Sequence, residues 1–241
     1  MGKELKSIES EANVRAARRQ DTLRVALVGY TNAGKSSWMR VLTTSTVVVE
    51  DKLFATLDTT VRALFPAVTP QILVSDTVGF IQRLPHDLVA SFRSTLAEAK
   101  GASLLLHVVD ASDPALEAQI QLTREVLNEI GVLEGNNVLV LNKIDCCDAE
   151  RCSELAARYP DALLVSAKRP QDVEELHRFI VGEFERLLDD LSLVVPYAQT
   201  SMIGEVHKRA RVVNEAFKDD GVHYKLKVTP TEARRLQRML S

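Results

Sequence analysis

A glycine-rich loop followed by a lysine and two serines stands early in the chain, in the stretch GYTNAGKSS at residues 29–37. Gly29, Gly34, Lys35 and Ser36 have the spacing of the phosphate-binding P-loop. The glycines let backbone N–H groups turn toward phosphate oxygens, Lys35 can bridge the β- and γ-phosphates, and the Ser36 hydroxyl can ligate Mg²⁺. This motif alone leaves ATPases, GTPases and small-molecule kinases open.

A second motif, Asp76-Thr77-Val78-Gly79, follows an apolar run. Asp76 can hold Mg²⁺ through a water molecule. The N–H of Gly79 can contact the γ-phosphate and so report whether that phosphate is present. A DxxG sequence is common by chance, and its position after the P-loop gives it weight.

A third motif, Asn142-Lys143-Ile144-Asp145, indicates which base is bound. Guanine offers two adjacent donors, N1–H and the 2-amino group, and the Asp145 carboxylate can accept from both. Adenine has neither donor, and a site of this kind can discriminate by roughly 10⁴-fold. Lys143 can lay its stem along the base, Asn142 can tie its loop to the P-loop, and the stretch Ser166-Ala167-Lys168 can close the pocket around the guanine O6.

The elements that must position these motifs alternate along the chain. Apolar runs predict strands, and amphipathic or polar runs with period 3.6 predict helices between them. Such alternation, with strands apolar throughout, indicates an α/β fold: a mostly parallel sheet covered by helices on both faces. Ligands of such folds bind at the carboxyl ends of strands, where all these motifs lie. The strands are expected at 23–29, 71–79, 102–110, 136–145 and 161–168, and the helices at 35–43, 86–100, 115–130, 150–159 and 173–188.

The pattern changes after residue 190. Residues 191–241 predict a strand, a helix, a hairpin with a turn at Asp220-Gly221, and a final helix, which together make a small C-terminal α+β domain. Residues 22–190 form the expected GTPase domain, and residues 1–21 a polar linker helix that ends a missing N-terminal domain. Residues 191–241 carry nine Lys/Arg and five Asp/Glu, a balance of +4 in a chain of net charge −3. That balance is compatible with a polyanionic partner.

Composition excludes several other classes of protein. The sequence contains no run of about 18 apolar residues, so it predicts no membrane span. The charged N-terminus lacks the apolar stretch of a secretory signal. Three cysteines, two of them adjacent, make neither a disulfide framework nor a zinc site, and we expect reduced thiols in a cytoplasmic protein. His107 is expected in the core, as are Trp38 and Met39.

These motifs, quoted at greater length, resemble one family. The stretches GYTNAGKS, LFATLD, DTVGFIQRLPHDLVASFRSTL, LLLHVVDASDP and NKID are similar to those of translation-factor-class P-loop GTPases, and in particular of the HflX family. The resemblance covers residues 22–190 well. It implies that Thr56 senses Mg²⁺ and the γ-phosphate, with Thr59 and Thr60 as alternatives. The family reads D-P-T-T-R after FATL; here residues 58–62 are D-T-T-V-R, so Thr59 stands in place of the proline and Val61 in place of the second threonine.

The resemblance implies a GTP-hydrolysing molecular switch that binds Mg²⁺ and associates with the large ribosomal subunit, through ribosomal RNA and protein, in ribosome rescue or splitting. Phe80 replaces the glutamine that orients water in Ras-like enzymes, so hydrolysis is expected to be slow without a partner. The alternative is a nucleotide-dependent binding module with vestigial hydrolysis; a P-loop kinase is poorer, because kinases need no guanine reader. A monomer is expected.

The sequence thus gives a full set of expected site residues. The catalytic set is Lys35, Thr56 and Gly79, and the Mg²⁺ set is Ser36, Thr56 and Asp76, the last through water. The nucleotide-binding set is Gly29, Tyr30, Thr31, Asn32, Ala33, Gly34, Lys35, Ser36, Ser37, Phe54, Ala55, Thr56, Leu57, Asp58, Asp76, Thr77, Val78, Gly79, Asn142, Lys143, Ile144, Asp145, Ser166, Ala167 and Lys168.

Overall fold

The structure is a computed structural model that describes residues 23–43, 60–76, 101–129, 131–132 and 136–240 of the chain. These residues fall into two compact units. One is formed by residues 24–66 and 73–180, and the other by residues 181–241 together with Leu23 and residues 67–72. Each unit is described by itself below.

The first unit is built on a six-stranded sheet with strand order β2-β3-β1-β4-β5-β6. Strand β4 pairs in parallel with β1 and with β5, and β5 pairs in parallel with β6. β2 lies at the edge and runs antiparallel to β3. The strands are β1 (Leu23–Val28), β2 (Thr60–Ala63), β3 (Ile72–Asp76), β4 (Leu104–Asp110), β5 (Asn137–Asn142) and β6 (Leu163–Leu164).

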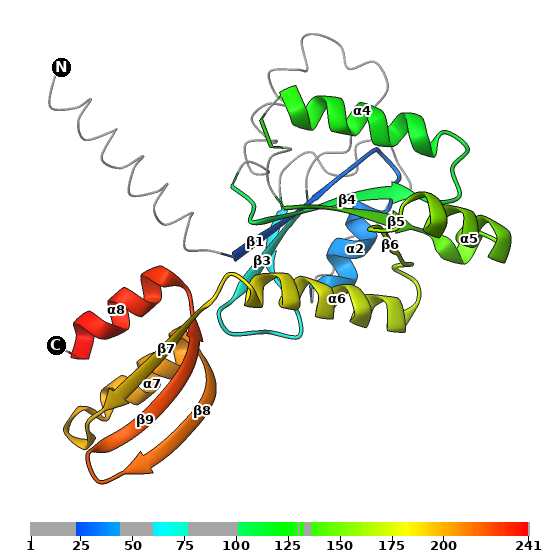
Figure 1. Ribbon diagram of the computed structural model, residues 1–241. Coiled ribbons are helices and arrows are strands. Elements are labelled where there is room, and N and C mark those ends of the chain that lie inside the picture. Colours follow the sequence, from blue (N-terminus) through cyan, green and yellow to red (C-terminus); the bar gives the residue numbers. More distant parts are fainter. Residues whose placement is uncertain (1–22, 44–59, 77–100, 130, 133–135, 241) are drawn as a thin grey trace, which may run out of the picture. The chain divides into compact units, whose positions relative to one another are not determined.

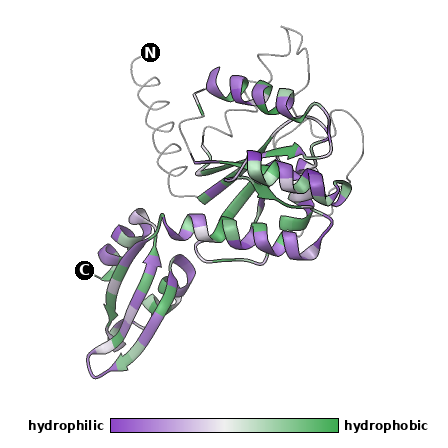
Figure 2. Ribbon diagram, turned by 45° about the vertical axis from the view of Figure 1, so that its right-hand side comes forward, coloured by the Kyte–Doolittle hydropathy of each residue, from purple (hydrophilic) through white to green (hydrophobic). Residues whose placement is uncertain are grey.

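Helices cover both faces of this sheet, as the sequence predicts (Figure 1). Helices α4 (Leu116–Glu129) and α5 (Ala149–Arg158) pack on one face through a core cluster that includes Val109 and Leu141. Helices α2 (Lys35–Leu42) and α6 (Pro170–Glu185) lie on the opposite face. The central strands are hydrophobic along their length, whereas the helices are hydrophilic on their outer sides (Figure 2).

The core explains why the chain folds in this way. Every residue of β4 from Leu104 to Val109 is buried, which fits a strand that is covered on both faces. Trp38 and Met39 of α2 are almost fully buried, in agreement with the sequence. His107 is also buried, and its pKa falls to about 3, because burial and then the nearby Arg124 and Lys35 disfavour its charged form. It is therefore a neutral core histidine, as expected.

The sequence predicted most of these elements; the differences concern β2, β6 and the bounds of α6, which begins and ends three residues earlier than the helix expected at 173–188. Strand β2 was not expected, because the segment 60–63 has only four residues, is half exposed and lacks a strong apolar signal. Strand β6 is only two residues long, although a strand over 161–168 was expected. Of that stretch, Val165 still donates its N–H to the carbonyl oxygen of Leu141 in β5 at 3.0 Å, and residues 166–168 form a loop before α6. The helix expected at 86–100 lies outside the described residues.

The second unit has the predicted strand, helix, hairpin and helix. Its three-stranded antiparallel sheet has the order β7-β9-β8, with β7 (Asp189–Val195), β8 (Arg211–Lys218) and β9 (Gly221–Val228). Helices α7 (Ser201–Arg209) and α8 (Pro230–Leu240) supply Met202, Val206 and Leu236 to a core of their own. Two short 3₁₀ turns complete the described elements, η1 (Ile144–Cys146) and η2 (Tyr197–Gln199).

Candidate functional site

The loop between β1 and α2 has a backbone that requires glycine at two positions. Gly29 has φ +144°, and a Cβ there would lie 2.0 Å from the carbonyl oxygen of Val108. Gly34 has φ +96°, and a Cβ there would lie 2.2 Å from the Asn142 side-chain nitrogen. Residues other than glycine rarely adopt either of these backbone conformations. The loop is therefore closely packed against the neighbouring strand ends, and its glycines are structural requirements.

Lys35, the first residue of α2, is folded back over this loop. Its Nζ donates to the carbonyl oxygens of Gly29 at 3.0 Å and Tyr30 at 2.8 Å, and its side chain is buried. Burial lowers the pKa of Lys35 to about 8, and the Asp76 carboxylate opposes that shift. The loop therefore holds a largely desolvated cation that an anionic ligand would stabilise.

Ser36 and Asp76 bring two oxygen donors together from different elements. The Ser36 hydroxyl, in the first turn of α2, donates to Asp76 Oδ2 at 2.9 Å, at the end of β3. Asp76 is buried. Hydroxyl and carboxylate oxygens are the ligands that Mg²⁺ prefers, and Mg²⁺ keeps several waters when it is bound by few protein groups. This pair fits a magnesium site that uses Ser36 directly and Asp76 through water.

Thr60, one of the alternatives for the sensing threonine, begins β2 and is paired with Asp76 in the antiparallel ladder. Its side chain is half-buried. The preferred residue, Thr56, lies outside the described residues. So do Phe54, Ala55, Leu57, Asp58, Thr77, Val78, Gly79 and Phe80, together with the alternative Thr59.

Asn142 joins three loops that are distant in sequence. Its side-chain nitrogen donates to the carbonyl oxygen of Ala33 at 2.8 Å, and its side-chain oxygen accepts from the N–H of Ala167 at 3.3 Å. Asn142 is 2% exposed, so both bonds are shielded from water. Such buried polar groups are costly to leave unpaired, and the three loops are therefore held in fixed relation.

Lys143 adopts an unusual backbone. Its φ of 64° places it in the left-handed region, which is uncommon for a residue with a long side chain. The N–H of Cys146 donates to its carbonyl oxygen at 2.9 Å, and its ammonium pairs with Asp110 Oδ2 at 2.8 Å. Asp110 ends β4, and its other oxygen accepts from the N–H and hydroxyl of Ser112. The ion pair holds the aliphatic stem of Lys143 in one orientation.

Asp145 receives two donors from the loop that follows β6. The Ser166 hydroxyl donates to Asp145 Oδ1 at 2.5 Å, and the Lys168 ammonium lies 3.2 Å from Oδ2. The hydrogen bond from Ser166 is the main reason that the pKa of Asp145 lies below its usual value; burial opposes it and Lys168 adds to it. The carboxylate therefore stays ionised at neutral pH. Each of its oxygens has two acceptor positions, so capacity remains for further donors.

The other expected residues of these loops have different surroundings. Asn32 has φ 61°, a conformation that asparagine tolerates well. Ala33 is buried and presents its carbonyl oxygen to Asn142. The side chain of Ile144 packs into the core beside α5, so it is turned away from the loop surface. Thr31 is half-buried in the loop, and Ser37 lies in the first turn of α2.

Two carboxylates that sequence reasoning missed support the expected residues. Asp110 pairs with Lys143, and Asp172 Oδ2 accepts the backbone N–H of Ser166 at 2.9 Å. Each had a modest signal in the sequence. Asp110 is the last residue of the strand expected at 102–110, and Asp172 immediately precedes the helix expected at 173–188, near a helix N-terminus where acidic residues are favoured by the helix dipole. Neither belongs to one of the motifs.

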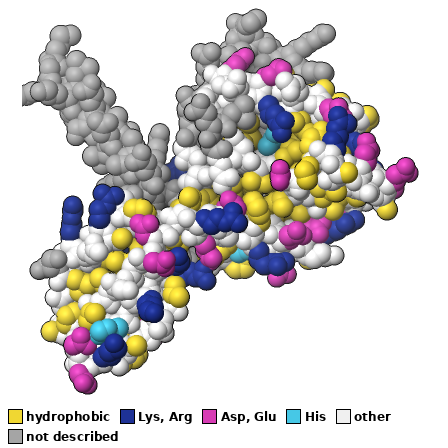
Figure 3. All heavy atoms as spheres, viewed as in Figure 1, with side chains coloured by type: hydrophobic (Ala, Val, Ile, Leu, Met, Phe, Trp, Pro, Cys, Tyr) yellow, Lys and Arg dark blue, Asp and Glu magenta, His cyan; other side chains and the backbone are white. Residues whose placement is uncertain are grey.

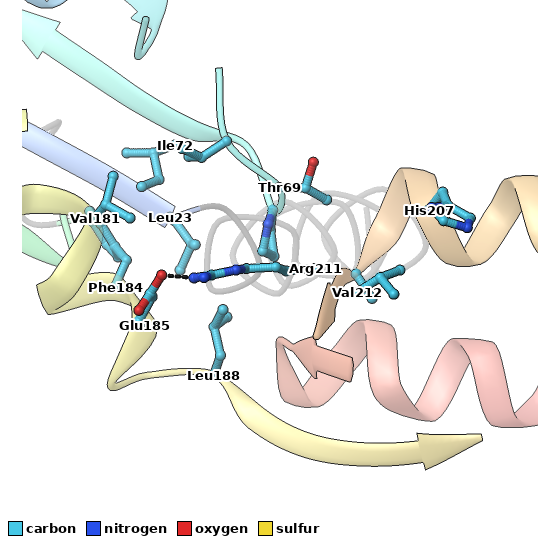
Figure 4. A pocket seen from close by; sticks show the side chains of 13 residues that line it. Leu23, Thr69, Ile72, Val181, Phe184, Glu185, Leu188, His207, Arg211 and Val212 are labelled. Carbon is cyan, nitrogen blue, oxygen red and sulfur yellow. Dashed lines mark ion pairs between the residues drawn. The ribbon is translucent and has the colours of Figure 1, made fainter. Parts of the chain in front are cut away.

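A separate pocket of about 480 Å³ lies in the second unit and contains none of the expected site residues. Its walls are mostly apolar, and an ion pair between Glu185 and Arg211 crosses it (Figure 4). The lining residues are Leu23, Val68, Thr69, Pro70, Ile72, Val181, Phe184, Glu185, Leu188, His207, Ala210, Arg211 and Val212.

Several basic side chains of residues 191–241 form ion pairs. Arg209 pairs with Glu205 at 2.6 Å and with Glu232 at 3.0 Å, and Lys227 pairs with Asp190 at 3.0 Å. On the face shown in Figure 3, basic and acidic side chains are interspersed. Of Glu205, Glu232 and Asp190, only Asp190 lies outside residues 191–241, so the pairs of Arg209 leave the balance of +4 unchanged.

Further observations bear on the excluded classes. The three cysteines are free thiols, as expected. None of the helices within the described ranges is both long and apolar enough to cross a membrane. Across those same ranges, no group of three or more His, Cys, Asp or Glu side chains is arranged to hold a metal ion.

Comparison with known proteins finds relatives that are all described as GTPases. A family model described as "50S ribosome-binding GTPase" matches residues 24–143. The chain is 53% identical over 238 residues to a protein named GTPase HflX from Gluconacetobacter diazotrophicus, covering 99% of this chain and 53% of that protein. It is 37% identical to GTPase HflX from Caldanaerobacter subterraneus, covering 98% of this chain and 54% of that protein. The chain thus spans about half the length of the curated relatives it matches.

Among solved structures, the chain is similar to a GTP-binding protein from the archaeon Sulfolobus solfataricus in complex with GDP. The TM-score is 0.54 at 29% identity, and the match covers 77% of this chain and 57% of that chain. This likeness agrees with the P-loop GTPase fold that the strand order and the glycine loop indicate.

Proposed function

The chain belongs to the HflX family of GTPases, and on that premise we propose that it binds GTP with Mg²⁺ and hydrolyses it to GDP and phosphate as a molecular switch. The observation that carries this proposal is the way Asn142 joins the phosphate-binding loop to the two base-reading loops. Asn142 ties the P-loop to the loops that hold Asp145 and Ser166, so the phosphate-binding and base-reading groups form one rigid surface. An ionised Asp145 at that surface selects guanine.

Each described residue has a distinct part in this scheme. The backbone N–H groups of residues 29–36 and the positive end of α2 receive the phosphates. Lys35 exchanges its bonds to the Gly29 and Tyr30 carbonyls for phosphate oxygens, and the negative charge restores its ordinary basicity. Ser36 and Asp76 hold the metal site. When bound there, Mg²⁺ neutralises charge on the β- and γ-phosphate oxygens.

On the basis of the family resemblance, we also propose that Thr56 and Gly79 contact the γ-phosphate and sense its presence. We expect segments 50–65 and 77–95 to respond to the loss of that phosphate, as the switch segments of GTPases do. Hydrogen exchange should differ most in these segments between the complexes with GDP and with a non-hydrolysable GTP analogue. Equal exchange in the two complexes would contradict the switch.

We further propose that the partner is the large ribosomal subunit, in a monomeric, cytoplasmic protein that acts in ribosome rescue or splitting. The description of the matching family model supports the choice of partner. Phe80 supports the need for one, because a phenyl ring cannot orient a water molecule by hydrogen bonding, so isolated hydrolysis should be slow.

Single-turnover hydrolysis of GTP, with and without purified large subunits, tests the proposal. We expect slow release of phosphate by the isolated chain and faster release with the subunits. The full-length relative from Gluconacetobacter diazotrophicus is the reference, because this chain spans half of it. Tight guanine nucleotide binding without hydrolysis under either condition would instead favour a binding module. Stimulation of the relative alone would show that the other half of that protein is needed.

A further inference from the structure

Asp172 occupies a buried position next to the base-reading loops. It lies in the first turn of α6 and is 9% exposed. Its Oδ2 accepts the backbone N–H of Ser166 at 2.9 Å. Its own backbone N–H donates to the carbonyl oxygen of Arg169 at 3.1 Å, which fixes the start of the helix relative to the loop. A carboxylate in this setting makes a strong, directional bond to the loop backbone.

The bond from Asp172 is the first of a short series. Ser166 is 1% exposed, and while its N–H is held by Asp172, its hydroxyl donates to Asp145 Oδ1 at 2.5 Å. The N–H of Lys168 donates back to the same hydroxyl oxygen at 3.2 Å. The orientation of the Asp145 carboxylate therefore depends on Ser166, and the position of Ser166 depends on Asp172.

We propose that Asp172 is a positioning residue for guanine selectivity, an inference that rests on the proposed function. It acts through Ser166 on Asp145 and does not contact the base. Without the acceptor, the buried N–H of Ser166 is unpaired, which costs free energy that the loop relieves by moving. Asp145 then loses the hydrogen bond from Ser166 that orients its carboxylate. It therefore accepts less well from the N1–H and the 2-amino group of guanine.

Four variants separate this role from a general effect on α6. Asp172→Ala removes the acceptor. Asp172→Asn keeps an acceptor oxygen in place and removes the charge. Asp172→Glu keeps the charge near the helix N-terminus and displaces the acceptor by one methylene. Glu174→Gln is the control, because Glu174 is an exposed acidic residue of the same helix.

The measurement is the dissociation constant of each variant for GDP and for inosine diphosphate, which lacks only the 2-amino group. We expect Asp172→Ala to weaken GDP about tenfold, in line with the loss of one buried hydrogen bond. The binding of inosine diphosphate should weaken less, so that the preference for GDP, measured as the ratio of the two dissociation constants, falls. Asp172→Asn should stay within about twofold of the wild type, as should Glu174→Gln, whereas Asp172→Glu should lose selectivity.

Several results would overturn the proposal. Equal weakening of both nucleotides by Asp172→Ala would indicate a structural role only. Loss of selectivity in Asp172→Asn with retention in Asp172→Glu would indicate that charge acts and the hydrogen bond does not. If thermal unfolding shows that Asp172→Ala does not fold, the selectivities of Asp172→Asn and Asp172→Glu are compared instead. A wild-type chain that does not prefer GDP to inosine diphosphate would instead refute the proposed function.

Discussion

The side-chain nitrogen of Asn142 donates a hydrogen bond of 2.8 Å to the carbonyl oxygen of Ala33, across 109 positions of sequence. Ala33 belongs to the phosphate-binding loop and Asn142 begins the base-reading motif. The same side chain accepts from the N–H of Ala167 in the third loop. One amide therefore sets the distance between the parts of the site that bind phosphate and base.

Replacing Asn142 by alanine should affect both stability and binding. The carbonyl of Ala33 and the N–H of Ala167 would lose their shared partner, and the two losses together cost roughly 2–6 kcal/mol of unfolding free energy. GDP should bind at least about tenfold more weakly, because the loops are no longer aligned. Denaturant unfolding and GDP titration check these effects. Asn128→Ala, at an exposed position of α4, is the matched control; an unchanged GDP affinity in Asn142→Ala would contradict the bridging role.

Replacing Asp145 by asparagine should change the preferred base. The amide presents a donor where guanine also has one, so GDP affinity should fall on the order of 10³- to 10⁴-fold. Xanthine carries an oxygen in place of the 2-amino group, so xanthosine diphosphate should bind better than GDP to this variant. Competition titration with the two nucleotides measures the change. A variant that still prefers GDP would exclude Asp145 as the base reader.

The affinity for GDP should fall above pH 8. Free Lys35 has a pKa of about 8, lowered by burial, and the bound phosphates restore the charged form. Below this pKa the ammonium is already present, whereas above it binding requires uptake of a proton. The dissociation constant should therefore rise about fourfold between pH 7 and pH 8.5. Lys35→Arg should bind more weakly at all pH values but lose this rise, because a guanidinium stays charged. A flat profile for the wild type would contradict the assignment.

Gly34 and Gly204 should respond in opposite ways to alanine. At Gly34 the added Cβ meets the Asn142 side chain at 2.2 Å in a left-handed conformation, so Gly34→Ala should destabilise the fold and weaken GDP. At Gly204, within α7, a Cβ meets nothing within 4 Å, so the substitution should add about 0.5–1 kcal/mol of stability. Thermal unfolding of both variants checks the pair. Tolerance of alanine at Gly34 would mean that the loop can adopt another backbone.

The sequence by itself determined the class of fold and the motifs. Runs such as that of β4 are apolar at all but two positions, which indicates a strand buried on both faces, and the alternation with amphipathic helices indicates a parallel sheet. Gly29, Gly34, Lys35 and Asp145 were found because their chemistry is local: a glycine conformation, a charge or a carboxylate at a fixed spacing. The P-loop GTPase fold was confirmed by the strand order and by the solved relative.

Only the tertiary structure decided how those residues are held. The bonds from Asn142 to Ala33, from Lys143 to Asp110 and from Ser166 to Asp145 join loops at the ends of different strands. No periodicity records such pairings, since they depend on which strand ends lie side by side. The short edge strand β2 was missed for a related reason, because its four residues are too few and too exposed to give a clear apolar signal, and its pairing with β3 is seen only in the structure.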